Sequence, residues 1–331
     1  MVTGAAGFIG SHVADECLAL GMEVVATDDL SGGFIENVSA EATWVEGDLR
    51  SAEFVDSLWR DHGPFAYVYH LGAYAAEGLS HFIRAFNYRT NLEASMYLLN
   101  QAITNDVERF VFTSSIAVYG AGQVPMTEDQ IPQPEDPYGV SKYAVELDLA
   151  AAHELFGIDY TVFRPHNVYG DRQNIADRYR NVIGIFMNAV LSGRSMPVFG
   201  DGTQSRAFSY ITDVAPIIAR SPLAGAARNE VFNLGADTPY TILELAEEIS
   251  SAFDVPLEVE HLPARNEVVH AFSDHSKVKL VFDPPDPVDL RTGIRRMAEW
   301  VKGHGPREAV EFVGEIEVAR NLPPSWRRTP A

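Results

Sequence analysis

The side chains whose types and spacing most directly indicate chemistry are Tyr138 and Lys142. Residues four apart on a helix project from the same face, so these two would lie side by side. An ammonium group beside a phenol favours the phenolate, and so lowers the tyrosine pKa toward a value that suits a general base near neutral pH. Ser115 ends an apolar segment 23 residues upstream, where its hydroxyl could hold a substrate oxygen beside that base. Taken alone, the pair is more typical of an exposed tyrosine and a solvated lysine, so its context decides.

A glycine-rich turn at the start of the chain supplies that context. The segment from Val2 to His12 predicts a strand end, a tight turn and a helix start, where backbone N–H groups and the helix dipole can hold a diphosphate. We expect Gly4 to allow the turn, Gly7 to let a phosphate approach the backbone, and Gly10 to let the helix pack against the strand. The pattern therefore predicts a dinucleotide site.

Asp28 indicates which dinucleotide is bound. It follows Gly10 by 18 residues, after an expected helix over 13–20 and an expected strand over 23–27. A carboxylate at about this distance beyond the turn meets the adenine ribose hydroxyls, and it would repel the 2′-phosphate of NADP. The predicted cofactor is NAD, and the alternative interpretation is a glycine turn in an unrelated α/β protein.

These residues must be positioned by alternating strands and helices. Apolar β-rich segments and helical periods alternate through the first half of the chain, which predicts parallel strands joined by crossover helices. We expect an α/β fold: a Rossmann-type doubly wound parallel sheet with a smaller, interwoven C-terminal α/β domain. Ligands of such sheets lie at the carboxyl ends of the strands. The expected strands include 43–45, 65–71, 109–114, 160–164 and 231–235, and the expected helices include 91–104 and 141–156.

Composition and charge exclude several other classes of protein. The 331 residues are 46% hydrophobic and 21% charged, with a formal net charge of −21, which argues against nucleic acid or an anionic membrane as a partner. The single cysteine, Cys17, excludes an intramolecular disulfide framework. Neither His12 nor His70 has a second ligand at metal spacing, so no metal is expected. Without a membrane-spanning run or a cleavable leader, we expect a cytoplasmic protein.

Taken together, the motifs resemble those of the extended short-chain dehydrogenase/reductases, and within them the nucleotide-sugar epimerases and dehydratases typified by UDP-glucose 4-epimerase. The resemblance runs from Val2 to about Trp300. The matching segments are the glycine turn, 47–49, 70–73, Asn91, 114–120, the Tyr138 and Lys142 pair, 167–170, 199–202 and Arg206.

The resemblance implies a catalytic set of Ser115, Tyr138 and Lys142 and tightly held NAD. In such enzymes the tyrosine takes the proton from the sugar 4-hydroxyl while C4 is oxidised, and the 4-keto sugar turns over and is reduced on its other face. The residues implied to bind the cofactor are Gly4, Gly7, Phe8, Ile9, Gly10, Asp28, Asp48, Leu49, Leu71, Gly72, Ala73, Asn91, Ser114, Tyr138, Lys142 and Pro165. Those implied to bind the substrate are Ser115, His166, Asn167, Asn181, Val182, Phe199, Arg206, Arg265, Glu267 and Ala271.

The resemblance also implies an organisation and partners. We expect an NAD-binding domain over 1–165, a nucleotide-sugar-binding domain over 166–302 and a C-terminal extension over 303–331. The extension is expected to be a surface helix followed by a loose end. The implied substrate is a nucleotide sugar, most simply a UDP-linked one, and the implied assembly is a homodimer.

Two positions bear on the identity of the sugar. Ala271 occupies the place where 4-epimerases carry a residue that limits the size of the 2-substituent, so its small side chain predicts that N-acetylated UDP-hexoses are accepted alongside plain ones. His166 is expected to donate a hydrogen bond to the substrate. A UDP-glucuronate 4-epimerase remains open, because Arg172, Arg178 and Arg180 cluster in one loop and an arginine there could pair with a C6 carboxylate.

Two further alternatives remain. A 4,6-dehydratase of the dTDP-glucose type carries an Asp-Glu pair directly after the position of Ser115, whereas Ile116 and Ala117 here cannot transfer protons. A non-catalytic NAD-binding regulator could use the same fold, since a fold does not fix a function. Retention of the Ser115, Tyr138 and Lys142 set favours an enzyme over a regulator.

Overall fold

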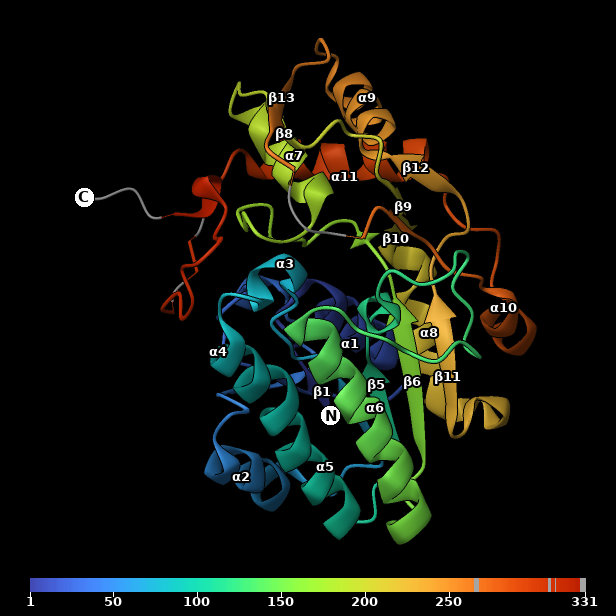
Figure 1. Ribbon diagram of the computed structural model, residues 1–331. Coiled ribbons are helices and arrows are strands. Elements are labelled where there is room, and N and C mark those ends of the chain that lie inside the picture. The colour runs from blue at the N-terminus through green and yellow to red at the C-terminus, as the bar shows by residue number, and fades with distance from the viewer. Residues whose placement is uncertain (265–267, 309–310, 313, 328–331) are drawn as a thin grey trace.

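The computed structural model describes residues 1–264, 268–308, 311–312 and 314–327, and its centre is a seven-stranded sheet (Figure 1). All strands of this sheet pair in parallel, in the order β11-β6-β5-β4-β1-β2-β3. They are β1 (Val2–Thr3), β2 (Val25–Asp28), β3 (Thr43–Glu46), β4 (Tyr67–His70), β5 (Arg109–Thr113), β6 (Tyr160–Pro165) and β11 (Glu230–Leu234). β5 and β6 are buried almost throughout, as parallel strands covered on both faces must be.

Helices cover both faces of this sheet. α2 (Ala52–His62), α5 (Ala94–Thr104) and α6 (Pro137–Phe156) lie on one face, where their leucines pack into a buried cluster with residues of β5 (Figure 1). α1 (Phe8–Ala19) and α8 (Ala215–Arg220) contact each other on the other face. The predicted doubly wound parallel sheet is confirmed.

The smaller part of the molecule is interwoven with the sheet. The chain leaves the sheet after β6, returns to it as β11 beside β6, and then leaves again, as the sequence predicts. The strands of this part are β7 (Val168–Tyr169), β8 (Met196–Phe199), β9 (Ser205–Ala207), β10 (Ser209–Tyr210), β12 (Pro239–Thr241), β13 (Val259–Leu262) and β14 (His270–Ala271). Its longer helices are α7 (Val182–Leu191), α9 (Ile242–Phe253), α10 (Ser276–Phe282) and α11 (Leu290–His304). A domain boundary at residue 165 stays a prediction.

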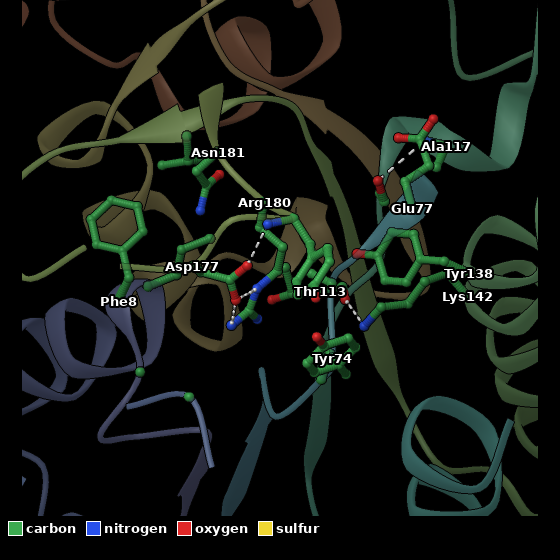
Figure 2. A pocket seen from close by; sticks show the side chains of 18 of the residues that line it. Phe8, Tyr74, Glu77, Thr113, Ala117, Tyr138, Lys142, Asp177, Arg180 and Asn181 are labelled. Carbon is green, nitrogen blue, oxygen red and sulfur yellow. Dashed lines mark hydrogen bonds and ion pairs between the residues drawn. The ribbon is translucent and has the colours of Figure 1, made fainter. Parts of the chain in front are cut away.

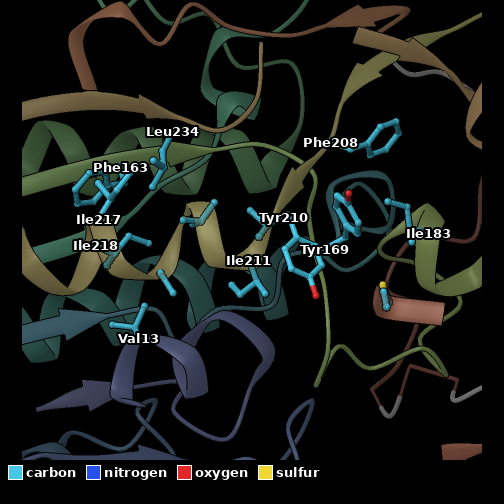
Figure 3. Packing of buried hydrophobic residues seen from close by; sticks show 14 of the residues in the cluster. Val13, Phe163, Tyr169, Ile183, Phe208, Tyr210, Ile211, Ile217, Ile218 and Leu234 are labelled. Atoms are coloured by element: carbon cyan, nitrogen blue, oxygen red, sulfur yellow. The ribbon is translucent and has the colours of Figure 1, made fainter. Parts of the chain in front are cut away.

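One hydrophobic core joins the two parts. Val13 of α1, Phe163 of β6 and Ile218 of α8 belong to the same buried cluster as Tyr169 and Ile183 of the smaller part (Figure 3). Burial of one such side chain contributes roughly 1.5–3 kcal/mol. Because the cluster is continuous, the smaller part is held at a fixed place above the carboxyl ends of the strands.

α6 begins earlier than the sequence predicts, and side-chain capping explains its start. α6 begins at Pro137, four residues before the expected start, because the Asp136 carboxylate accepts a hydrogen bond from the Gly139 N–H at 2.9 Å. α1 begins at Phe8, directly after Gly7, within the segment where the sequence predicts a helix start. Tyr138 is therefore in the first turn of α6, and the glycine turn opens straight into α1.

The C-terminal extension differs from the expected surface helix and loose end. Its described residues pack on α3 (Glu77–Ser80) and α4 (Arg84–Tyr88), and a buried cluster joins Leu79 and Ile83 to Phe312, Leu322 and Trp326. These contacts connect residues more than 200 positions apart, so nothing in the local sequence pattern revealed them. Among the described residues, no helix combines the length and apolar character needed to cross a membrane.

Candidate active site

A cavity of about 780 Å³ lies at the carboxyl ends of β1, β4, β5 and β6, under the smaller part (Figure 2). The predicted cofactor residues that line it are Gly4, Gly7, Phe8, Ile9, Gly10, Asp28, Asp48, Leu49, Leu71, Gly72, Ala73, Ser114, Tyr138, Lys142 and Pro165. The predicted substrate residues that line it are Ser115, His166, Asn167, Asn181, Val182, Phe199, Arg206 and Ala271. Arg265 and Glu267 lie outside the described residues.

The glycine turn between β1 and α1 forms one end of the cavity. Gly4 has a φ of +66°, and a Cβ on Gly10 would lie 2.0 Å from the carbonyl oxygen of Gly4. A Cβ on Gly7 would lie 3.0 Å from the same oxygen. α1 begins after Gly7 without a side-chain cap, so the N–H groups of its first turn face the cavity. This is the local structure that a diphosphate requires.

Acidic side chains line the cavity beyond the turn. The Asp28 carboxylate, at the end of β2, accepts hydrogen bonds from the N–H groups of Leu30 at 2.8 Å and Ala6 at 3.2 Å, and burial raises its pKa. Asp48 forms an ion pair with Arg50 at 2.7 Å, and this hydrogen bond lowers the pKa of the Asp48 carboxyl. The uncapped turn together with the carboxylate of Asp28 fits the diphosphate and ribose of a dinucleotide.

Tyr138, Lys142 and Ser115 come together at the opposite wall. Lys142 Nζ donates to the carbonyl oxygen of Thr113 at 2.8 Å and lies 5.9 Å from the centre of the Tyr138 ring. Ser115 precedes a short 3₁₀ turn, and its hydroxyl accepts from the Ala117 N–H at 3.1 Å. The Ser115 hydroxyl also forms a hydrogen bond with the Tyr138 side chain. The spacing of four residues therefore places phenol and ammonium on one face of α6.

The electrostatics of this set differ from the expectation in one respect. Burial raises the pKa of Tyr138, and this effect outweighs the opposing effects of the Ser115 hydrogen bond and the charge of Arg180. Burial also lowers the pKa of Lys142 to about 7, against the opposing charge of Glu146. The expected lowering of the tyrosine pKa by Lys142 is absent because both groups are desolvated, and desolvation favours the neutral form of each.

A buried ion pair supports the strand ends beneath these groups. The Arg164 guanidinium pairs with Glu146 through two nitrogens, and Glu146 also accepts from the Ser114 hydroxyl. Arg164 Nη1 donates to the Tyr119 hydroxyl at 2.6 Å. Each charged group is thus hydrogen-bonded, which fixes the ends of β5 and β6 relative to α6.

The predicted substrate residues lie on the side of the cavity formed by the smaller part. Arg206 of β9 donates to the carbonyl oxygens of Ser205 at 2.8 Å and Val269 at 2.9 Å while lining the cavity. Asn167 has a φ of +41° and donates to the Ala207 carbonyl at 3.1 Å. Ala271 of β14 is 7% exposed and belongs to a small apolar cluster beside the cavity.

His166 is placed differently from the expectation. It lines the cavity, but its Nδ1 lies 3.0 Å from the Ala207 carbonyl oxygen and its Nε2 lies 3.0 Å from the Nε2 of His275. Burial lowers the pKa of His166 to about 3, and the nearby His275 acts in the same direction. With both nitrogens engaged by the protein, the imidazole presents its ring to the cavity rather than a donor to the substrate.

Asn91 lies behind the cavity instead of lining it. Its side chain is buried, accepts from the Tyr74 N–H at 2.8 Å and donates to the Tyr74 carbonyl at 3.1 Å. Asn91 therefore positions Tyr74, a lining residue that the sequence did not suggest. Three other lining residues, Arg50, Asp177 and Gly314, were not predicted from the sequence, because they come from distant segments and form no local pattern.

Comparison with known proteins identifies the family. Residues 1–235 match the NAD dependent epimerase/dehydratase family. A UDP-glucose 4-epimerase from Mycolicibacterium smegmatis is 32% identical, over 91% of this chain and 98% of that protein. A UDP-N-acetyl-alpha-D-glucosaminuronate decarboxylase from Bacillus cytotoxicus is 26% identical, over 96% of this chain and 98% of that protein, so similarity leaves the reaction open.

Solved structures with a similar fold also belong to nucleotide-sugar epimerases. UDP-glucose 4-epimerase from Thermotoga maritima with UDP-glucose is 33% identical, with a TM-score of 0.85 over 92% of this chain and 98% of that one. UDP-N-acetylglucosamine 4-epimerase from Methanobrevibacter ruminantium, in complex with UDP-N-acetylmuramic acid, is 32% identical, with a TM-score of 0.84 over 92% and 97%. The glycine turn, Asp28 and the cavity that they line accommodate the cofactor of this family, NAD. The chain is therefore an enzyme of the NAD-dependent epimerase/dehydratase family.

Proposed function

We propose that this enzyme inverts C4 of a UDP-hexose, with Tyr138 as the general base, and that it accepts N-acetylated UDP-hexoses alongside plain ones. The observation that supports the proposal is the convergence of Tyr138, Ser115 and Lys142 at one wall of a cavity whose other end is the glycine turn. By the same resemblance, we propose a cytoplasmic homodimer.

The residues of the chain have the following roles in this proposal. Bound NAD supplies the oxidation and the later reduction of the sugar carbon. Ser115 holds the sugar 4-oxygen beside Tyr138, which removes the hydroxyl proton and later returns it. In its protonated form Lys142, whose Nζ lies 5.9 Å from the centre of the Tyr138 ring, would offset part of the cost of burying negative charge on the phenol.

The nucleotide part of the substrate would lie against the smaller part of the molecule. Phe199 and Arg206 line the cavity there, and the planar guanidinium of Arg206 suits a phosphate oxygen. Ala271 is the register partner of Arg206 in the β14 and β9 pairing, so it lies beside the proposed phosphate ligand. Its methyl group leaves space for a bulky substituent on the sugar.

The arginine loop gives little support to a uronate substrate. Arg172 pairs with Asp15 at 2.7 Å, and Arg178 pairs with Glu311 at 3.4 Å. Arg180 lines the cavity, but its charge is neutralised by Asp177 at 2.6 Å. A C6 carboxylate would have to compete with an existing ion pair, so we rank UDP-glucuronate second.

The reaction itself is tested with purified enzyme and no added cofactor. Incubation with a panel of nucleotide sugars, followed by NMR of the products, should show conversion of a UDP-hexose into its C4 epimer with no net NADH. A 4-keto-6-deoxy product would instead select the dehydratase alternative. Bound NAD without turnover of any sugar on the panel would favour a non-catalytic regulator.

A further inference from the structure

The chain beyond α11 runs along one side of the molecule toward α3 and α4 (Figure 1), and we call its described residues, 305–308, 311–312 and 314–327, the strap. The strap lies beyond residues 1–235, the part of the chain that the family model covers. It is first fixed at α7, where Asn188 exchanges two hydrogen bonds of 2.9 Å with the backbone of Arg307. The Arg307 guanidinium also lies 4.4 Å from the centre of the Phe34 ring.

A second attachment fixes the strap to α4. The Glu317 carboxylate accepts from the N–H groups of Ala85 at 2.7 Å and Phe86 at 2.9 Å, at the helix N-terminus, where a negative charge is favourable. The Glu317 N–H donates to the Phe82 carbonyl at 2.8 Å. The strap therefore supplies hydrogen-bond acceptors that α4 does not provide for itself.

Two aromatic side chains of the strap reach residues that border or line the cavity. Trp326 is 5% exposed and packs edge-on against Tyr179, with ring centres 5.4 Å apart, and a Cβ on Gly78 would lie 3.1 Å from its ring. Phe312, also buried, packs against Tyr74 with ring centres 5.5 Å apart. Gly314 lines the cavity itself.

These contacts converge on Arg180, which stands in the cavity between Asp177 and Tyr74 (Figure 2). Its guanidinium lies 4.9 Å from the centre of the Tyr74 ring and pairs with Asp177 at 2.6 Å. Tyr179 precedes Arg180 in the chain, so the packing of Trp326 on Tyr179 supports the backbone of Arg180. Phe312 supports the Tyr74 ring that the Arg180 guanidinium contacts. Burial raises the pKa of Tyr138, and the charge of Arg180 acts against this rise, which places Arg180 within electrostatic reach of the base.

We propose that the strap completes the sugar end of the cavity, with Trp326 and Phe312 as positioning residues that hold the Tyr179–Arg180 segment and Tyr74 in place. The inference rests on the proposed function only for the identity of the substrate. Beside the cavity, Trp326 and Phe312 contact Tyr74, Gly78 and Tyr179, whereas the proposed nucleotide ligands lie on β8 and β9. Loss of the strap contacts should therefore weaken binding of the sugar and leave binding of UDP unchanged.

The test compares full-length Trp326→Ala and Phe312→Ala with Val318→Ala, a control on the strap whose side chain is 42% exposed. Calorimetric titration with UDP and with UDP-glucose distinguishes binding of the nucleotide from binding of the sugar. We expect the Trp326→Ala variant to bind UDP-glucose about tenfold more weakly, which corresponds to about 1.4 kcal/mol of binding free energy. KM should rise by the same factor, and kcat should change little. UDP affinity should be unchanged, and Trp326→Phe should restore most of the loss. Equal weakening for UDP and UDP-glucose, or no weakening for either, would overturn the proposal.

Hydrogen exchange in the ligand-free protein tests the strap without any assumption about the substrate. Trp326→Ala should speed amide exchange in 177–181 and at Ala85 and Phe86, with wild-type rates in Val318→Ala. If the wild-type enzyme binds no UDP-hexose, the proposed function is wrong. The amide exchange rates would still show whether the strap holds the Tyr179–Arg180 segment in place. Unchanged amide exchange in Trp326→Ala would refute the positioning role of the strap, whichever substrate the enzyme uses.

Discussion

Ala271 lies directly opposite Arg206 in the parallel pairing of β14 with β9, and both residues line the cavity. The methyl group of Ala271 packs with Val118, Tyr119 and Met126 at that edge. A larger side chain at position 271 would have to extend into the cavity, because the apolar cluster behind it is already filled.

We therefore expect Ala271→Tyr to abolish activity on UDP-N-acetylglucosamine while sparing UDP-glucose. The phenol would occupy the space that the N-acetyl group requires and leave the hydroxyl-bearing sugar room to turn. The measurement is kcat/KM for both substrates in wild type and variant. An unchanged ratio between the two would show that position 271 does not limit the 2-substituent.

The base is tested by Tyr138→Phe. The ring remains packed in the first turn of α6, but the group that we propose removes the sugar hydroxyl proton is lost, so kcat should fall by roughly 10²–10⁴-fold. Folding and bound NAD, followed by circular dichroism and absorbance, should be retained. Near-normal turnover would mean that another group acts as the base.

The glycine turn gives a prediction about cofactor retention. Gly10→Ala should expel NAD and lower the melting temperature, because the new Cβ would lie 2.0 Å from the Gly4 carbonyl oxygen. Gly303→Ala, near the end of α11 with no neighbouring atom within 4 Å of the new Cβ, is the control. It should stabilise the protein by roughly 0.5–1 kcal/mol. If Gly10→Ala purifies with a full complement of NAD, the close approach at the turn is not needed for cofactor binding.

Lys142 should make stability depend on pH. Its pKa falls to about 7 on burial, so the unfolded chain binds about half a proton more than the folded one at pH 7 and about one more between pH 8 and 9. The free energy of unfolding of the wild type should then rise by about 1.4 kcal/mol per pH unit above pH 8 relative to Lys142→Met. Urea unfolding of both proteins at pH 7, 8 and 9 measures this difference, and parallel pH profiles would contradict a buried, neutral lysine.

Much of the framework could be predicted from sequence because the deciding interactions are local. The glycine turn, the apolar strands and the Tyr138 and Lys142 spacing each depend on residues within a few positions of one another. β5, expected over 109–114, spans Arg109–Thr113, and β11, expected over 231–235, spans Glu230–Leu234. The error at the start of α6 comes from capping by Asp136, which a search for apolar periodicity does not detect.

The remaining features depend on partners that are distant in sequence. The burial that raises the pKa of Tyr138, the His275 partner of His166 and the packing of Trp326 on Tyr179 all arise only once the chain has folded. The same holds for the arginine loop, where Asp15 and Glu311 determine which arginines are already paired. A sequence pattern names such residues but does not show what they contact.

In the proposed reaction, one carbon of the sugar is oxidised and then reduced again on its other face. The most direct measurement follows UDP-glucose carrying deuterium at C4, incubated with purified enzyme in ordinary water without added cofactor. We expect UDP-galactose that retains the deuterium at C4, since in the proposed reaction the hydrogen leaves and returns to the same carbon. Inversion with loss of the deuterium to solvent, or no inversion of any UDP-hexose, would contradict it.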